Sequence, residues 1–303
     1  MLLHVLHETS YDYVPVVRTA QHMAHLKPAS TGGQRLLSHR LKVDPAPARQ
    51  TEAVDVYGNT RCFFSLQASH DKLRIRAESL VSTAVSPPPD SSLSWEDVAE
   101  RMRYHREARY DPASEFVFAS PYVPRDLAFA SYAQPSFDEG RPLLEAAHDL
   151  MHRVHEDFEY ATTATDVNTP ALEALSLRKG VCQDLAHVML GCLRSLGLPA
   201  RYVSGYLLTE PPAGRPRLVG TDASHAWVAL YLPEAEGTGT WLEFDPTNDR
   251  LAGEDYVRLA TGRDYSDVSP VRGVIHGGAN HSLRVAVTVT PASGPAPELQ
   301  AAS

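Results

Sequence analysis

The sequence is poor in cysteine and has no long apolar run, and each absence excludes a class of protein. Its three cysteines, Cys62, Cys182 and Cys192, form no C-x-x-C motif, so neither a disulfide framework nor a cysteine-built zinc site is expected. No segment approaches the roughly 18 uninterrupted apolar residues of a membrane-spanning helix. Met1–Leu6 lacks the basic start and the longer apolar run of a secretory signal. We therefore expect a reduced, cytoplasmic chain without a membrane span.

Positive charge is also scarce, with 28 Lys and Arg residues against 37 Asp and Glu residues and a net charge of −9. Lys and Arg supply most of the affinity for phosphate backbones and for anionic lipid, so nucleic acid and membrane surfaces are not expected partners. The 43% apolar and 21% charged residues are typical of a globular chain with a large core. At roughly 100 to 200 residues per domain, the 303 residues predict two domains.

Residues 1–86 are predicted to form a small antiparallel sandwich or barrel. Apolar and polar residues alternate in Leu3–Glu8, Arg40–Asp44 and Lys72–Ala77, which is the period of a β-strand with one buried face. Tyr57–Thr60 contains a glycine and an asparagine and is typical of a hairpin turn. Three consecutive prolines, Pro87–Pro89, then mark a boundary, because proline cannot donate to a strand ladder.

Beyond this boundary the pattern favours helices. Ser94 is a candidate N-cap of a helix that runs to about Tyr110, and Leu143–Phe158 forms a second helix opened by Pro142. We expect residues 87–140 to be a linker and a partly helical segment. Residues 141–292 are expected to form the C-terminal domain, and residues 293–303 a disordered tail.

The most informative helix is predicted from about Gly180 to Gly197. Its apolar residues recur at helical spacing, and Gly197 followed by Pro199 is a stop signal. Cys182 then lies in the first turn, where the free N–H groups and the helix dipole favour a negative charge by about 0.3–1 kcal/mol, or up to ~2 kcal/mol when partly buried. A thiolate is the nucleophilic form of cysteine, although a small buried cysteine would fit the same pattern.

Two later segments, Ser224–Leu232 and Thr240–Pro246, are predicted to form a β-hairpin. A loop over Pro233–Gly237 would pair Leu232 with Thr238 and place His225 directly opposite Asp245. Opposite residues project to one face with Cβ atoms about 4.5–5.5 Å apart, which allows a carboxylate–imidazole hydrogen bond.

Together these three side chains match a nucleophile, a base and an orienting acid. Cys182 would attack a carbonyl, His225 would transfer the proton, and Asp245 would orient the imidazole. Each residue alone has a simpler interpretation: a buried cysteine, a half-buried histidine or an Asp-Pro turn at a strand end.

Four sequence blocks carry a family resemblance, and they are Gly180–His187, Gly197–Tyr206, Ala223–Trp227 and Phe244–Asn248. In their order and spacing they resemble the bacterial transglutaminase-like cysteine protease family, as does Gly262–Gly273. The strand-rich segment before residue 86 resembles the N-terminal bacterial transglutaminase-like domain of that family.

The resemblance implies an α+β fold with a papain-like, transglutaminase-like core, in which a helix with an N-terminal cysteine packs on an antiparallel sheet. An N-terminal β-sandwich-like domain would precede this core. It also implies a Cys182–His225–Asp245 triad that needs no cofactor. Animal transglutaminases use calcium, but the sequence has no loop of the calcium-binding type.

The wider superfamily uses an upstream aromatic or amide side chain to help hold the oxyanion, and Tyr160 and Gln183 are the candidates here. Tyr160 could equally be a core or turn aromatic, and Gln183 a solvated first-turn residue. The backbone N–H of Cys182 needs no particular side chain to serve as a donor. Cys62 and Cys192 are interpreted as packed, inert thiols.

His148, His152 and His155 share one helix face at spacings of four and three and could bind a metal, but a solvated face is favoured over a metal site. The preferred function is a thiol-dependent hydrolase that cleaves a peptide or isopeptide bond in a peptide or protein substrate. One alternative is an amine acyltransferase, which differs only in whether water or an amine attacks the acyl-enzyme. An arylamine acetyltransferase lacks support because no acyl-coenzyme site is recognisable. A non-catalytic binding module on the same fold is the third hypothesis, and the oligomeric state stays open.

Overall fold

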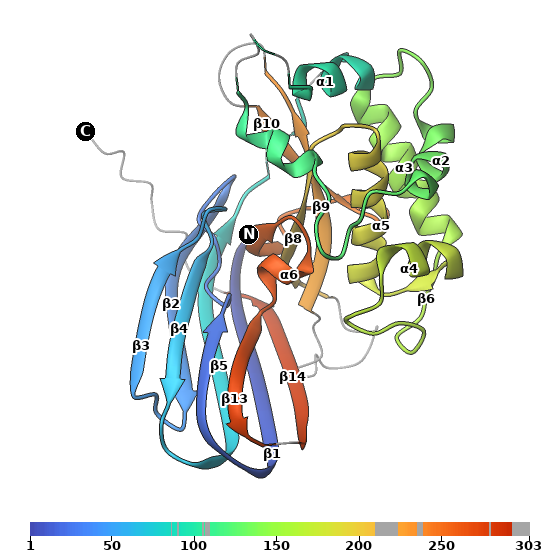
Figure 1. The fold of residues 1–303 in the computed structure, drawn as a ribbon. Helices are drawn as coiled ribbons and strands as arrows, with labels where there is room; N and C mark the ends of the chain where they lie inside the picture. Colours follow the sequence, from blue (N-terminus) through green and yellow to red (C-terminus); the bar gives the residue numbers. More distant parts are fainter. Residues whose placement is uncertain are drawn as a thin grey trace, which may run out of the picture.

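The computed structural model describes residues 1–85, 87–89, 91–104, 106, 110–209, 224–234, 239–278 and 280–292. The predicted tail at 293–303, Ser86 of the predicted boundary and most of the predicted hairpin loop lie outside the described residues. The fold is α+β, with a long antiparallel sheet at one end and a second sheet covered by helices at the other (Figure 1).

Seven strands form the first sheet, and all its pairs are antiparallel. The strands are β1 (Leu2–Ala24), β2 (Gln34–Asp44), β3 (Arg49–Val54), β4 (Thr60–Leu66), β5 (His70–Thr83), β13 (Val271–Gly277) and β14 (Asn280–Pro291). The predicted strand-rich N-terminal region is confirmed. Its turn lies between β3 and β4, where Gly58 adopts a positive φ of 86°.

The long strand β1 organises this sheet. Strands β4 and β5 lie end to end along one edge of β1, and β13 and β14 lie end to end along the other. The first strand therefore lies beside the last two, as the blue and red ribbons of Figure 1 show. Both β13 and β14 lie within residues 141–292, the range predicted for the C-terminal domain. They nevertheless pair with β1 in the N-terminal sheet.

The second sheet has five antiparallel strands in the order β11-β10-β9-β8-β12. Its members are β8 (Ala200–Leu207), β9 (Ser224–Leu232), β10 (Thr240–Asp245), β11 (Arg250–Leu251) and β12 (Tyr256–Gly262). Tyr206 on β8, with Val257 and Leu259 on β12, joins the buried cluster of the first sheet, which includes Leu3 and Val5 on β1. The two sheets therefore share a core, and this contact fixes the position of β1 relative to β8.

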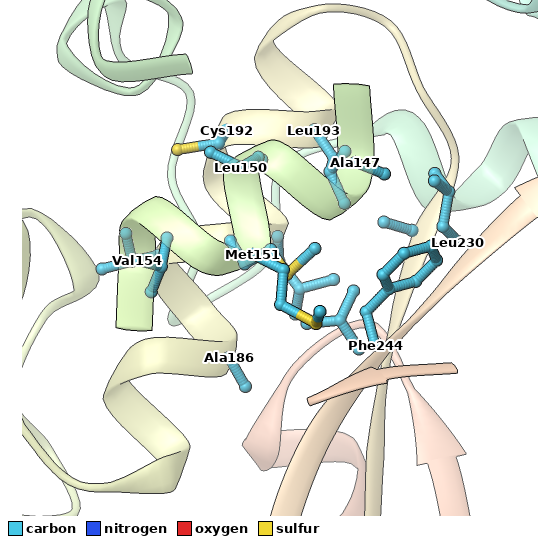
Figure 2. Close-up of a cluster of buried hydrophobic side chains, with 14 of the residues drawn as sticks. Ala147, Leu150, Met151, Val154, Ala186, Cys192, Leu193, Leu230 and Phe244 are labelled. Atoms are coloured by element: carbon cyan, nitrogen blue, oxygen red, sulfur yellow. The ribbon is translucent and has the colours of Figure 1, made fainter. Parts of the chain in front are cut away.

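Helices cover the other face of the second sheet. They are α1 (Trp95–Met102), η1 (Pro112–Val117), α2 (Leu127–Ala133), η2 (Gln134–Ser136), α3 (Leu143–Asp157), α4 (Ala171–Leu177), α5 (Cys182–Ser195) and the short α6 (Tyr265–Val268). Two-residue strands β6 (Glu159–Tyr160) and β7 (Lys179–Gly180) pair in parallel just before α5. Figure 2 shows the main core, where side chains of α3 and α5 meet Leu230 of β9 and Phe244 of β10.

The predicted helix starts agree with the structure, but one helix ends earlier than predicted. Ser94 caps α1 by accepting a hydrogen bond from Asp97 N, but the helix ends at Met102 rather than Tyr110, because Arg103 adopts an extended conformation. Helix α5 begins at Cys182, and its end is followed by Gly197 at a φ of 81°.

Helix α5 is more buried than its single apolar stripe predicts. Every residue from Asp184 to Arg194 is buried, because α2, α3, α4 and the sheet surround the helix. A Cβ on Gly191 would lie 2.7 Å from the Phe129 ring of α2, so this close helix packing requires glycine. The helix that carries Cys182 is therefore the rigid centre of the domain.

Candidate active site

Cys182 is the first residue of α5, and its surroundings hold the start of this helix in place. The buried carboxylate of Asp184 accepts hydrogen bonds from Val181 N at 2.8 Å and from Thr165 Oγ1 at 2.6 Å. A Cβ on Gly180 would lie 2.6 Å from this carboxylate, so glycine lets the chain pass it closely. Cys182 is only partly buried. The sulfur therefore lies at a fixed helix N-terminus, which is the position that the sequence predicts.

His225 and Asp245 meet, although the predicted strand register is wrong. Leu232 pairs with Thr240 rather than Thr238, so the hairpin is shifted by two residues and His225 is not directly opposite Asp245. A two-residue shift keeps both side chains on the same face of the sheet. The two residues therefore interact diagonally, and His225 Nε2 lies 2.7 Å from Asp245 Oδ2.

The Asp245 carboxylate is fully buried and accepts hydrogen bonds at both oxygens. Oδ1 accepts from the backbone N–H groups of Thr247 at 2.9 Å and Asn248 at 3.3 Å. Besides His225, Oδ2 accepts from Asn248 Nδ2 at 2.7 Å and from the Tyr256 hydroxyl at 2.6 Å. Burial opposes ionisation, but these hydrogen bonds and the charge of His225 hold the pKa of Asp245 below its usual value.

The imidazole of His225 also lies within electrostatic range of the Cys182 thiol, and both residues line the same cleft. Because Nε2 already contacts Asp245, Nδ1 is left for the sulfur. Burial alone would lower the pKa of His225. The hydrogen bond to Asp245 and the negative charge of that carboxylate, with a further contribution from Cys182, instead raise the pKa to about 10. The arrangement favours an imidazolium beside the Asp245 carboxylate at neutral pH.

Two supporting residues were not predicted as site residues. Asn248 lies in one of the quoted sequence blocks, but its side-chain contact with Asp245 has no sequence signature. Tyr256 lies on β12, beyond the matching hairpin, and reaches Asp245 only because β12 joins the far side of β8. Both side chains donate to the Asp245 carboxylate, and Asn248 Nδ2 also lies 3.4 Å from His225 Nε2.

The two candidate oxyanion residues lie in different environments. Gln183 lines the cleft beside Cys182, and its Nε2 donates to the Val167 carbonyl at 3.1 Å. Tyr160 on β6 is 55% exposed and is not among the cleft-lining residues. Burial, and then the charges of Cys182 and Asp184, raises the pKa of Tyr160, so its hydroxyl lies within electrostatic range of the sulfur.

The three histidines of α3 have separate partners. His152 Nδ1 lies 2.7 Å from Asp249 Oδ2, and His155 Nδ1 donates to the Thr247 carbonyl at 3.0 Å. His148 packs edge-on against Phe244. Within the described part of the chain, no group of three or more His, Cys, Asp or Glu residues is placed to hold a metal. Two of these imidazoles instead hold the turn that follows Asp245.

The remaining thiols are buried in cores. Cys192 is fully buried on α5, and burial raises the pKa of its thiol well above the usual range (Figure 2). Cys62 on β4 is 5% exposed, and burial likewise raises its pKa. Cys182 is the thiol that borders a cleft.

A cleft of about 440 Å³ opens over Cys182 and His225. Its walls come from both sheets: Tyr202 and Ser204 of β8 lie on one side, and β1 and β14 form the other. Tyr265 of α6 also lines the cleft, and its backbone N donates to the buried Nε2 of His187 at 3.2 Å. The cleft therefore exists only because the two sheets pack against each other.

The His225–Asp245 pair predicts a pH-dependent part of the stability. Folding raises the pKa of His225 from 6.5 to about 10, so this contribution is complete below pH 6.5 and is lost as the pH rises toward 10. Folding lowers the pKa of Asp245, so that contribution is lost in acid. We expect His225→Gln to flatten the alkaline fall of the unfolding free energy in urea titrations. The exposed His276→Gln is the control and should leave this fall unchanged; an equal alkaline fall in His225→Gln would contradict the assignment.

Comparison with known proteins places the chain in a family. A model of the transglutaminase-like superfamily matches residues 130–246, and one of the bacterial transglutaminase-like N-terminal region matches residues 3–82. An uncharacterised Mycobacterium tuberculosis protein is 39% identical over 295 residues, which cover 96% of this chain and 93% of the relative. The chain belongs to the transglutaminase-like superfamily. The family recognised from the sequence is confirmed.

Other relatives of this transglutaminase-like chain agree with the fold. An uncharacterised Mycobacterium leprae protein is 31% identical over 291 residues, which cover 95% of this chain and 98% of the relative. The crystal structure of a Cytophaga hutchinsonii protein described as a candidate cysteine protease superposes with a TM-score of 0.71. It shares 21% identity and covers 97% of this chain and 92% of its own. The predicted α+β, papain-like core is therefore confirmed.

A further match covers less than half of the chain. A protein-glutamine gamma-glutamyltransferase of Pseudomonas aeruginosa is 34% identical over 128 residues, which cover 41% of this chain and 18% of that protein. Over the residues that the structure describes, none of the helices of the transglutaminase-like chain is long and apolar enough to cross a membrane.

Proposed function

We propose that this transglutaminase-like protein is a thiol-dependent hydrolase that cleaves a peptide or isopeptide amide bond. One observation carries the proposal: Asp245 is hydrogen-bonded to His225, and His225 shares a cleft with Cys182, whose thiol lies within electrostatic range of the imidazole. The imidazole thus lies between a buried carboxylate and a thiol at a helix N-terminus, which is the arrangement that nucleophilic catalysis needs.

The first half of the reaction forms an acyl-enzyme. The Cys182 sulfur attacks the substrate carbonyl carbon, and the carbonyl oxygen takes up the negative charge. The backbone N–H of Cys182, which has no partner within the helix, is a donor for this oxyanion, and the Gln183 side chain lies nearby. His225 then gives its proton to the leaving amine, the C–N bond breaks, and a thioester remains.

The second half releases the acyl group. His225, now neutral, takes a proton from water as the water oxygen attacks the thioester carbonyl. The C–S bond breaks, a carboxylic acid leaves, and the thiolate–imidazolium pair is restored. Throughout the cycle Asp245 holds the imidazole orientation and balances its charge. The steps are complete with the residues of this chain and one water.

Amine transfer is the second candidate, and the match to the Pseudomonas aeruginosa gamma-glutamyltransferase favours it. The acyl-enzyme would be the same, but a primary amine would replace water as the attacking group. A binding module without activity is the third hypothesis, but such a module does not need a complete acid–base–nucleophile chain. We also propose a cytoplasmic location, because the Cys182 thiol must stay reduced to act.

Incubation with a peptide library, with and without a fluorescent primary amine, distinguishes these functions. We expect cleavage products that require Cys182, with wild type compared against Cys182→Ala. Amine-labelled products that also require Cys182 would assign the acyltransferase instead. Neither product, together with equal behaviour of the two proteins, would contradict enzymatic activity and favour the binding module.

A further inference from the structure

The wall of the cleft that faces Cys182 is built by the first and last long strands of the chain. Three residues of β1 pair directly with three residues of β14: His7 with Val287, Thr9 with Val285, and Tyr11 with Leu283. All six side chains line the cleft. Opposite residues of an antiparallel pair project to one face, so they form a continuous surface that we name the β1–β14 wall.

The inner part of this wall is polar but offers no charged group to a substrate. His7 is almost fully buried, and its two ring nitrogens contact Thr9 Oγ1 at 2.8 Å and the Tyr206 hydroxyl at 3.0 Å. Burial lowers the pKa of His7 to about 4, so its ring is neutral at neutral pH. Both nitrogens are therefore engaged within the protein, and His7 offers no cation to a substrate.

The outer part of the wall is apolar and open. Val287 is 1% exposed, whereas Val285 and Leu283 next to it along the strand are 50% and 52% exposed. Half-exposed valine and leucine side chains that border a nucleophile leave apolar surface for a ligand to cover. Pro270, just before β13, and Val271, its first residue, extend this apolar surface.

Apart from the His225 imidazolium, the described lining of the cleft carries no charged side chain. No Lys, Arg, Asp or Glu is among the residues that line it within the described part of the chain. A charged substrate side chain that lies against the β1–β14 wall would lose water without gaining a charged partner there, which is unfavourable. An apolar side chain would cover the exposed faces of Val285 and Leu283.

The acyl side of the substrate is the part that the cleft must hold throughout the reaction. In the proposed cycle the acyl group stays attached to Cys182 while the leaving amine departs and water or another amine enters. The leaving side must therefore open to solvent, and the acyl side must stay bound through both halves.

We propose that the β1–β14 wall is the acyl-side subsite, and that it accepts an uncharged, apolar residue next to the scissile carbonyl. The inference rests on the proposed function, because it takes Cys182 as the nucleophile. It assigns a substrate-selecting role to the N-terminal sheet, which carries none of the three triad residues.

Peptidyl chloromethyl ketones test the subsite, because the Cys182 sulfur displaces chloride and no natural substrate is needed. Three probes carry leucine, aspartate or lysine next to the reactive ketone, and the second-order rate of inactivation is measured for each. In the wild-type protein we expect the leucyl probe to react about tenfold or more faster than either charged probe. Equal rates for all three probes would overturn the subsite.

Two variants place charge on the wall. Val285→Asp should reduce the rate of the leucyl probe about tenfold and reverse the preference toward the lysyl probe, and Leu283→Lys should favour the aspartyl probe. The matched control is Val274→Asp, since Val274 is 78% exposed on β13 of the same sheet but does not line the cleft. Unchanged rate ratios in both wall variants, or the same change in the control, would overturn the proposal.

Iodoacetamide labelling in the same preparations separates the two proposals, because this reagent is too small to need the wall. Selective labelling of Cys182 without any preference among the peptidyl probes would overturn the subsite alone. If iodoacetamide does not label Cys182 selectively in the wild-type protein, the proposed function is overturned, and the subsite with it.

Discussion

Replacing Cys182 with alanine is expected to abolish amide turnover, with a fall of roughly 10⁴-fold or more in kcat/KM. The nucleophile is lost, and no second thiol can replace it, because Cys192 is fully buried and Cys62 lies in the core of the other sheet. The measurement is the steady-state rate on the best peptide from the library, with circular dichroism to confirm the fold. The partly exposed position of Cys182 predicts that the variant folds normally.

The matched control for this prediction is Cys62→Ala, which also removes one thiol. Cys62 is 5% exposed on β4 and is not among the residues that line the cleft. This variant should keep its turnover and lose some stability through the small cavity it creates. Turnover in Cys182→Ala within about a hundredfold of the wild-type value would show that another group is the nucleophile.

Asp245→Asn is expected to lower kcat roughly 10³- to 10⁴-fold. An amide cannot balance the charge of the His225 imidazolium, and it removes one of the two oxygens on which five hydrogen bonds converge. Because a buried donor loses its acceptor, the free energy of unfolding should also fall by about 1–3 kcal/mol. The measurements are kcat and urea denaturation of the same protein.

Tyr256→Phe is the graded comparison for Asp245. It removes a single hydroxyl that donates to Asp245 Oδ2 and leaves the contact of Asp245 with His225 in place. We expect a loss of kcat much smaller than that of Asp245→Asn. A kcat of Asp245→Asn within tenfold of wild type, at reduced stability, would mean that Asp245 is a structural residue only.

Local patterns were sufficient to predict the parts of the site that lie on single elements. The helical spacing of apolar residues and the Gly197 stop signal place Cys182 at the start of α5, and the structure has it there. The period of two in the hairpin places His225 and Asp245 on one face, which survives the register error of two residues. The error arose because β9 ends at Leu232 and β10 begins at Thr240, so the connection is longer than the predicted five residues.

These local patterns could not predict which strands distant in the sequence pair with each other. Strand β14 pairs with β1 across more than 250 residues, and nothing in the local sequence of either strand indicates this partner. The contact of Tyr256 with Asp245 likewise depends on β12 joining the far edge of β8. The cleft wall and the support of Asp245 therefore follow from the tertiary fold rather than from periodicity.

Selective alkylation tests directly whether Cys182 is the nucleophile that His225 activates. The protein is treated with limiting iodoacetamide at about pH 6.5, near the usual histidine pKa, and the labelled cysteine is identified by peptide mapping. We expect Cys182 to be labelled before Cys62 and Cys192, and His225→Gln to slow this labelling sharply. Preferential labelling of another cysteine, or an equal labelling rate in His225→Gln, would show that Cys182 is not a nucleophile activated by His225.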